Sequence, residues 1–162
     1  MSEKTSFSSK TLEQLRSWGG PSQLSAFEAM MWLAEADPHL RSTTTSVMVL
    51  DSSPDWGRLV AGHDWTTRAA PRLRQKVMEP AFGLDMPVWV DDPEFLLDYH
   101  LRRVRLPEPG TERQLLDYAQ TLAMTPFDRC RPPWEAVLVE GLENGGAAYI
   151  LNLHHAISDG IG

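Results

Sequence analysis

The chain has 162 residues, of which 42% are hydrophobic and 23% are charged, and its formal net charge is -7 at pH 7. This composition is typical of one globular domain with a single core and disfavours a disordered or fibrous protein. A nucleic-acid partner is also disfavoured, because phosphate binding needs clustered cations. The basic clusters at 72–76 and 102–105 are short. We interpret them mainly as solvated faces, although one could meet an anionic cofactor or a lipid headgroup.

The cysteine content and the apolar runs indicate the compartment. A single cysteine, Cys130, cannot form an internal disulfide, which fits a reducing environment. The sequence has no apolar run of the length that a spanning helix requires, and residues 1–20 lack the apolar core of a signal peptide. We therefore expect a cytoplasmic protein that contacts a membrane or a lipid droplet only peripherally.

Residues 1–20 are expected to form a flexible N-terminal leader, and residues 21–162 one folded domain. Within the leader, a possible capping box of Thr11 and Gln14 predicts a short helical turn that ends at Gly-Gly-Pro. Both a membrane-touching segment and an ordinary disordered leader are compatible with this pattern.

A stronger helix signal begins in LSAFEAMMWLAEAD, residues 24–37, where Ser25 and Glu28 form a capping box. Apolar side chains then recur at the spacing of one buried helix face before Pro38: Phe27, Met30, Met31 and Ala34. The run TTTSVMVLD, residues 43–51, is short and β-branched, which predicts a strand. A second helix is expected to begin at Trp56.

The middle of the chain gives weaker signals. Prolines and a glycine interrupt residues 71–90, so we expect mostly loop there. Residues 98–106 are expected to form a strand with four side chains on one side: Tyr99, Leu101, Arg103 and Arg105.

The last third of the chain is better defined. Thr111 and Gln114 form a capping box, and five apolar residues line one face of the following helix until Pro126: Leu115, Leu116, Ala119, Leu122 and Ala123. Residues 134–142 and 147–153 then form a hairpin around an Asn-Gly-Gly turn. The interleaved helices and strands predict an α/β fold, as a two-layer sandwich.

The segment NLHHAISDGIG, residues 152–162, carries the candidate site. Strand alternation predicts that His154 and His155 point to opposite faces, while the following turn brings Asp159 back near the strand and Gly160 permits unusual backbone angles. Three interpretations remain open: two packed or solvent-facing residues, a metal site, and a catalytic base with a structural carboxylate. The metal site is disfavoured because adjacent strand residues cannot easily converge on one ion, so we expect none.

HHAISDG resembles the HHxxxDG motif of the bacterial wax ester synthase/diacylglycerol acyltransferase family, a branch of the CoA-dependent acyltransferases. Three further segments resemble that family in the family's order: residues 24–37 (LSxxDxxFLxxE), 71–77 (PRxRxRL) and 132–142 (PLWExxLIEGL). Two departures keep the local character, since Glu28 stands where the family usually has Asp and Pro133 replaces Leu.

The resemblance implies one lobe of a chloramphenicol-acetyltransferase-like fold, with residues 21–162 as an N-terminal lobe that is truncated after the motif. His155 would be the general base that takes the hydroxyl proton of diacylglycerol or a fatty alcohol. The oxygen would then attack the thioester of a long-chain acyl-CoA, a co-substrate rather than a bound cofactor. Asp159 would be structural, and His154 and Gly160 would shape the motif.

Three functions follow as alternatives. The first is an O-acyltransferase of neutral-lipid synthesis that is completed by a missing C-terminal lobe or by self-association. The second is a non-catalytic lobe that binds acyl-CoA, lipid or a partner chain. The third, a condensation-type or acetyltransferase-type enzyme with soluble acceptors, is disfavoured by the three flanking segments.

Overall fold

The computed structural model describes residues 9–157 of the chain. A four-stranded mixed sheet forms its centre, in the order β1 (Thr43–Leu50), β6 (Ala147–His154), β5 (Trp134–Glu140) and β4 (Leu101–Arg105). The first three strands are antiparallel, and β4 runs parallel to β5. The predicted first strand and the predicted hairpin are therefore confirmed.

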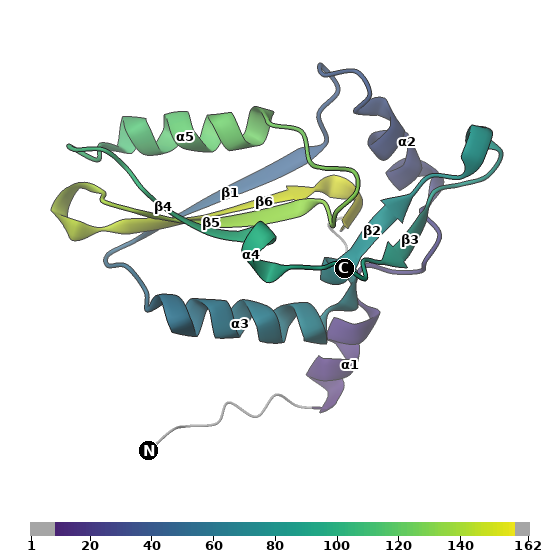
Figure 1. The fold of residues 1–162 in the computed structure, drawn as a ribbon, viewed down its shortest axis with the longest axis horizontal. Helices are drawn as coiled ribbons and strands as arrows, with labels where there is room; N and C mark the ends of the chain where they lie inside the picture. Colours follow the sequence, from purple (N-terminus) through teal and green to yellow (C-terminus); the bar gives the residue numbers. More distant parts are fainter. Residues whose placement is uncertain (1–8, 158–162) are drawn as a thin grey trace.

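Helices cover both faces of this sheet (Figure 1). On one face α5 (Glu112–Met124) packs Leu115 and Leu122 against apolar residues of β5 and β6. On the other face α3 (Trp56–Ala69) packs Leu59 and Val60 against the alternate residues of the same strands. The α/β class is confirmed, and the expected two layers become three, because β5 and β6 carry apolar side chains on both faces.

The second helix, α2 (Ala26–Ala34), begins with the predicted capping box of Ser25 and Glu28 but buries a different face. Its buried residues are Ala29, Met31 and Trp32, whereas Phe27 and Met30 are 58% and 57% exposed. The helix lies against one end of the sheet, so only a narrow stripe of its surface is covered. In α5 the predicted capping box is also confirmed, but Leu116 is exposed.

The structure corrects two predictions for the middle of the chain, each in part. Residues 71–90 include the antiparallel strands β2 (Gln75–Met78) and β3 (Val88–Asp91), in which Val77 and Trp89 are paired and buried. Polar and apolar residues do not alternate in QKVM or VWVD, so no period of two marks these strands in the sequence.

The expected strand at 98–106 begins only at Leu101, because α4 (Leu97–His100) precedes it. Tyr99 therefore does not share a strand face with Arg103. The helical turn allows His100 to stack between Phe95 and Trp134, at centroid distances of 5.1 and 4.7 Å. Short 3-10 turns complete the fold at Pro71–Arg74, Ala81–Gly83, Glu143–Gly145 and His155–Ile157.

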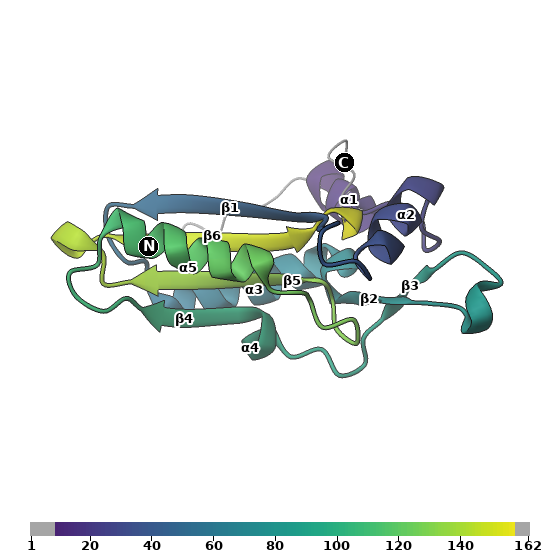
Figure 2. The ribbon, with the colours of Figure 1, turned by 90° about the horizontal axis from the view of Figure 1, so that it is seen from above.

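The first described helix, α1 (Ser9–Ser17), contains Thr11, so Thr11 does not cap it as expected. Trp18 follows the helix and packs against the core on the α3 side of the sheet. Figure 2 shows that α1, α2 and the β2–β3 hairpin gather at the end of the sheet where β6 finishes. Among residues 9–157, no helix is long and apolar enough to cross a membrane.

Candidate functional site

His154 is the last residue of β6 and is fully buried. Its backbone N–H donates to the carbonyl of Pro133 at 2.9 Å, and its ring Nδ1 accepts from the backbone N–H of Ala156 at 3.0 Å. Because Nδ1 is an acceptor, the proton of the neutral ring lies on Nε2. The ring thus fixes the turn that follows it.

Helix α2 closes the space around the His154 ring. Trp32 meets it edge-on at a centroid distance of 5.0 Å, and Oε1 of Glu35 lies 3.6 Å from Nε2. This separation is too long for a hydrogen bond, and no described residue accepts one from Nε2. Burial, and to a smaller extent the nearby Arg129 and His155, lowers the pKa of His154 to about 4. The ring is therefore neutral at neutral pH.

His155 begins the 3-10 turn that follows β6. Strand alternation stops at His154, so the period that predicted opposite directions does not extend to His155. Its backbone N–H donates to the carbonyl of Ser42 at 2.7 Å, and no described residue pairs with its buried Nδ1. His155 is only half-buried, so it is the histidine of the pair that keeps accessible surface. Asp159 and Gly160 lie outside the described residues.

The segments at 24–37, 71–77 and 132–142, distant in sequence, meet behind the two histidines. The first supplies Trp32 and Glu35 to the His154 ring, and the last supplies the Pro133 carbonyl to its backbone. The indole N–H of Trp134 donates to the carbonyl of Leu73 at 2.7 Å, which joins the last segment to the middle one. All three segments therefore support the same turn.

Arg72 corrects the expectation of a solvated cluster at 72–76, because it is 3% exposed. Its Nη2 donates to the carbonyls of Gly19, Gly20 and Pro21, and its guanidinium lies 4.4 Å from the ring centre of Trp89. Burial lowers its pKa to about 10, so it remains charged at neutral pH. Arg72 thus holds the 19–21 segment against the domain.

The cluster at 102–105 fits the expected solvated face better. Arg102 and Arg103 are about half-exposed and pair with Glu135 and Glu140 at 2.9 and 2.8 Å.

The thiol of Cys130 is free and exposed. Within residues 9–157, no group of His, Cys, Asp and Glu side chains has the arrangement of a metal site.

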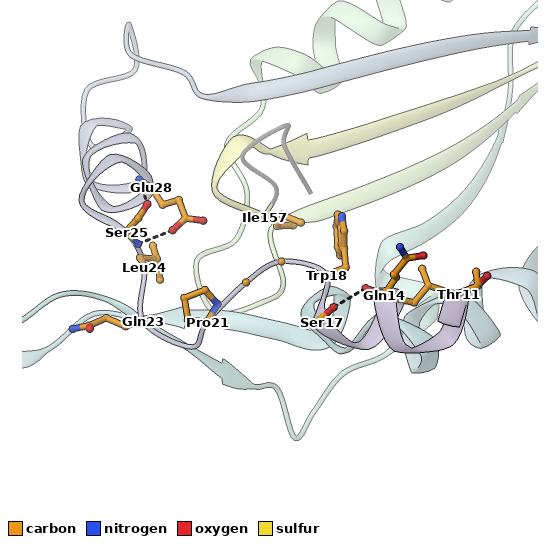
Figure 3. A pocket seen from close by; sticks show the side chains of 13 residues that line it. Thr11, Gln14, Ser17, Trp18, Pro21, Gln23, Leu24, Ser25, Glu28 and Ile157 are labelled. Carbon is orange, nitrogen blue, oxygen red and sulfur yellow. Dashed lines mark hydrogen bonds between the residues drawn. The ribbon is translucent and has the colours of Figure 1, made fainter. Parts of the chain in front are cut away.

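An open, mainly apolar groove of about 930 Å³ lies beside the histidine turn. Its walls come from α1, from the segment at 17–25 and from the first turn of α2 (Figure 3). Leu15, Trp18 and Leu24 contribute apolar surface, and Ile157 closes one side. Because Ile157 ends the turn that begins with His155, that turn borders the groove.

Two residues of this site, Glu35 and Ser42, were not singled out by the sequence. For Glu35 a signal existed, since it is the last glutamate of the segment that resembles LSxxDxxFLxxE. Ser42 contributes only backbone atoms, and no sequence pattern marks such a role.

Comparisons with known proteins decide the family. The model of the wax ester synthase/diacylglycerol acyltransferase catalytic domain matches residues 24–162. The chain belongs to this family. A putative diacylglycerol O-acyltransferase of Mycobacterium tuberculosis is 42% identical over 140 residues, which cover 86% of this chain and 28% of that protein. A second putative diacylglycerol O-acyltransferase of the same species is 36% identical over 150 residues, or 89% of this chain and 30% of the relative.

Solved structures agree with this assignment. The wax ester synthase/diacylglycerol acyltransferase from Marinobacter aquaeolei VT8 superposes with a TM-score of 0.72 at 26% identity, over 86% of this chain and 36% of the other. The first condensation domain of the calcium-dependent antibiotic synthetase gives 0.65 at 20% identity, over 83% and 34% of the two chains, and shares the fold. The chain spans only about a third of these acyltransferase relatives.

Proposed function

We propose that this chain forms the histidine-bearing part of an O-acyltransferase, which moves a long-chain acyl group from acyl-CoA to diacylglycerol or a fatty alcohol. The chain belongs to the acyltransferase family, and the observation that carries the proposal is the position of His155 in its structure. Its backbone is fixed to Ser42, it keeps accessible surface, and its turn borders the apolar groove. His154 is enclosed and cannot meet a substrate directly.

In the proposed reaction His155 is the general base. It takes the proton of the acceptor hydroxyl as the oxygen attacks the thioester carbonyl. A carbon–oxygen bond forms, the carbon–sulfur bond breaks, and the proton returns from His155 to the departing CoA sulfur. In this scheme His154, Asp159 and Gly160 shape the motif, with Asp159 in a structural role. The groove beside Ile157 suits an extended apolar chain of the substrate.

A second candidate is a non-catalytic lobe that binds acyl-CoA, lipid or a partner chain. It is favoured by apolar side chains that stand more than half exposed on and beyond α2: Phe27, Met30 and Leu40. Exposed apolar patches commonly mark surfaces that bind something else.

Thiol release from palmitoyl-CoA separates these candidates. The purified chain is mixed with palmitoyl-CoA and either hexadecanol or dioleoylglycerol, and compared with His155→Ala and with His39→Ala, a control at an exposed histidine. Acceptor-dependent release that His155→Ala abolishes and His39→Ala preserves supports the acyltransferase. Release that His155→Ala leaves unchanged rejects His155 as the base. Binding of palmitoyl-CoA without release favours the second candidate.

A further inference from the structure

The carboxylate of Glu35 is linked to both histidines, directly to the ring of His154 and through Ser42 to the backbone of His155. Its Oε1 accepts the backbone N–H of Ser42 at 2.6 Å, and the carbonyl of Ser42 accepts the backbone N–H of His155 at 2.7 Å. The same Oε1 faces Nε2 of His154 at 3.6 Å. The side chain of Glu35 is only 8% exposed, so water competes little for these contacts.

The position of this carboxylate matters for the His154 tautomer. A negative charge opposite Nε2 favours the ring form that carries its proton there. That form leaves Nδ1 free to accept the N–H of Ala156 at 3.0 Å. In the other tautomer Nδ1–H would oppose the Ala156 N–H, and the turn that begins with His155 would lose its hydrogen bond.

Glu35 is itself well anchored, through its neighbour Trp32. The indole N–H of Trp32 donates to Oε1 of Glu79 at 2.8 Å, and Nη2 of Arg129 donates to the carbonyl of Trp32 at 2.6 Å. Nη1 of Arg129 also donates to Glu79, at 2.6 Å. These bonds tie the last turn of α2 to the β2–β3 hairpin and to the segment before β5, which gives the carboxylate a rigid base.

We propose that Glu35 is a positioning residue, which selects the Nε2–H tautomer of His154 and, through Ser42, fixes the backbone of His155. Its effect on turnover rests on the proposed acyltransferase function. Its effect on the tautomer and on the backbone does not, and can be observed in the chain without substrate.

Nitrogen NMR of the histidine rings and amide hydrogen exchange test the proposal in the full chain. The wild type should show His154 as the Nε2–H tautomer. Glu35→Ala should give a mixture of tautomers and raise exchange at the Ser42 and His155 amides by about tenfold or more. Glu35→Gln keeps an acceptor oxygen and should hold both amides within about threefold of the wild type. Asp37→Ala removes an exposed carboxylate two residues further on and should change neither signal.

Glu35→Asp guards against a variant that does not fold. The aspartate keeps the negative charge but is shorter by one methylene group. The His154 tautomer and the exchange of the Ser42 and His155 amides should therefore change in the same direction as in Glu35→Ala, but by less. Unchanged tautomer and amide exchange in Glu35→Asp and in folded Glu35→Ala would overturn the proposal.

Turnover adds a readout that separates this proposal from the proposed function. If the chain transfers acyl groups, Glu35→Ala should lower kcat by about tenfold to a hundredfold with little change in KM, and Glu35→Gln should restore most of it. If the chain has no turnover, the NMR result still decides the role of Glu35. If the NMR signals do not move, the His155→Ala test of the acyltransferase still stands.

Discussion

The carbonyl oxygen of Pro133 lies 2.9 Å from the backbone nitrogen of His154 and accepts its hydrogen bond. This bond continues the β5–β6 ladder beyond the pair of Trp134 and Leu153. Trp134, the next residue, sends its indole N–H to the carbonyl of Leu73. The proline–tryptophan segment therefore supports the histidine motif on one side and the β2–β3 region on the other.

The tryptophan bond gives a stability prediction with a matched control. Trp134 and Trp89 are both 3% exposed, but only the indole N–H of Trp134 has a hydrogen-bond partner among the described residues. Trp134→Phe should lower the free energy of unfolding by about 1–3 kcal/mol more than Trp89→Phe, because it leaves the Leu73 carbonyl without its donor. Urea unfolding of both variants measures this difference. Equal losses would show that the Leu73 bond contributes nothing net.

The two faces of α2 show what sequence pattern can and cannot predict. The capping box of Ser25 and Glu28 is local chemistry, and it was predicted correctly. The buried face was predicted wrongly. Almost every position of AFEAMMWLA is apolar, so several faces of the helix are equally apolar and the sequence does not distinguish them. Packing against the end of the sheet selects Met31 and leaves Met30 exposed.

Adjacent methionines therefore test the selected face. Met31 is 9% exposed and Met30 is 57% exposed, although the sequence placed both on one buried stripe. Met31→Gln should lower the free energy of unfolding by about 1–3 kcal/mol, because it buries a side-chain amide at a position built to pack an apolar side chain. Met30→Gln should stay within about 0.5 kcal/mol of the wild type. Denaturant unfolding measures both variants. A larger loss for Met30→Gln would mean that Met30 faces the core or a second molecule.

The candidate site was predictable to a similar depth. The histidine pair and its strand were visible in the sequence as a local pattern, and the three supporting segments were visible through their resemblance to family segments. The contact of Glu35 with His154 and the backbone bond from His155 to Ser42 were not, because they join the end of α2 and the start of β1 to the end of β6, more than a hundred residues away. Such contacts depend on how the elements pack.

Two neighbouring glycines, Gly19 and Gly20, differ in how much space a side chain would find, because Arg72 packs against only the first. Gly19 and Gly20 both have positive φ, at +90° and +71°, so alanine strains the backbone at either position. A Cβ on Gly19 would lie 2.5 Å from Nε of Arg72, whereas a Cβ on Gly20 would have no atom within 4 Å. Arg72 is buried and bonded to three carbonyls, so it has little room to move.

We expect Gly19→Ala to destabilise the chain by about 1–3 kcal/mol more than Gly20→Ala, which is the usual cost of forcing an extra methyl group into packed space. Thermal or urea unfolding gives the two values, and amide exchange at residues 17–23 should rise mainly in Gly19→Ala. If the two variants lose the same stability, the 19–21 segment is not held by Arg72.

The buried ring of His154 predicts how stability changes with pH. Burial lowers its pKa from 6.5 to about 4, so between these values the unfolded chain binds a proton that the folded chain does not. Stability from this ring is therefore complete above pH 6.5 and falls as the pH drops towards 4, by about 3 kcal/mol at most. In His154→Gln the free energy of unfolding should fall less between pH 6.5 and pH 4, by up to that amount, whatever the variant's stability at pH 7.

His100 contributes a fall of the same sign, because burial also lowers its pKa. The pH dependence should therefore shrink in His154→Gln without vanishing, and shrink further when His100→Gln is added. Urea unfolding at intervals between pH 4 and pH 7 measures the slopes of the wild type and the two variants. A wild-type slope retained in full by His154→Gln would mean that the ring takes up its proton while folded, and that the space between Trp32 and Glu35 admits a charged imidazole.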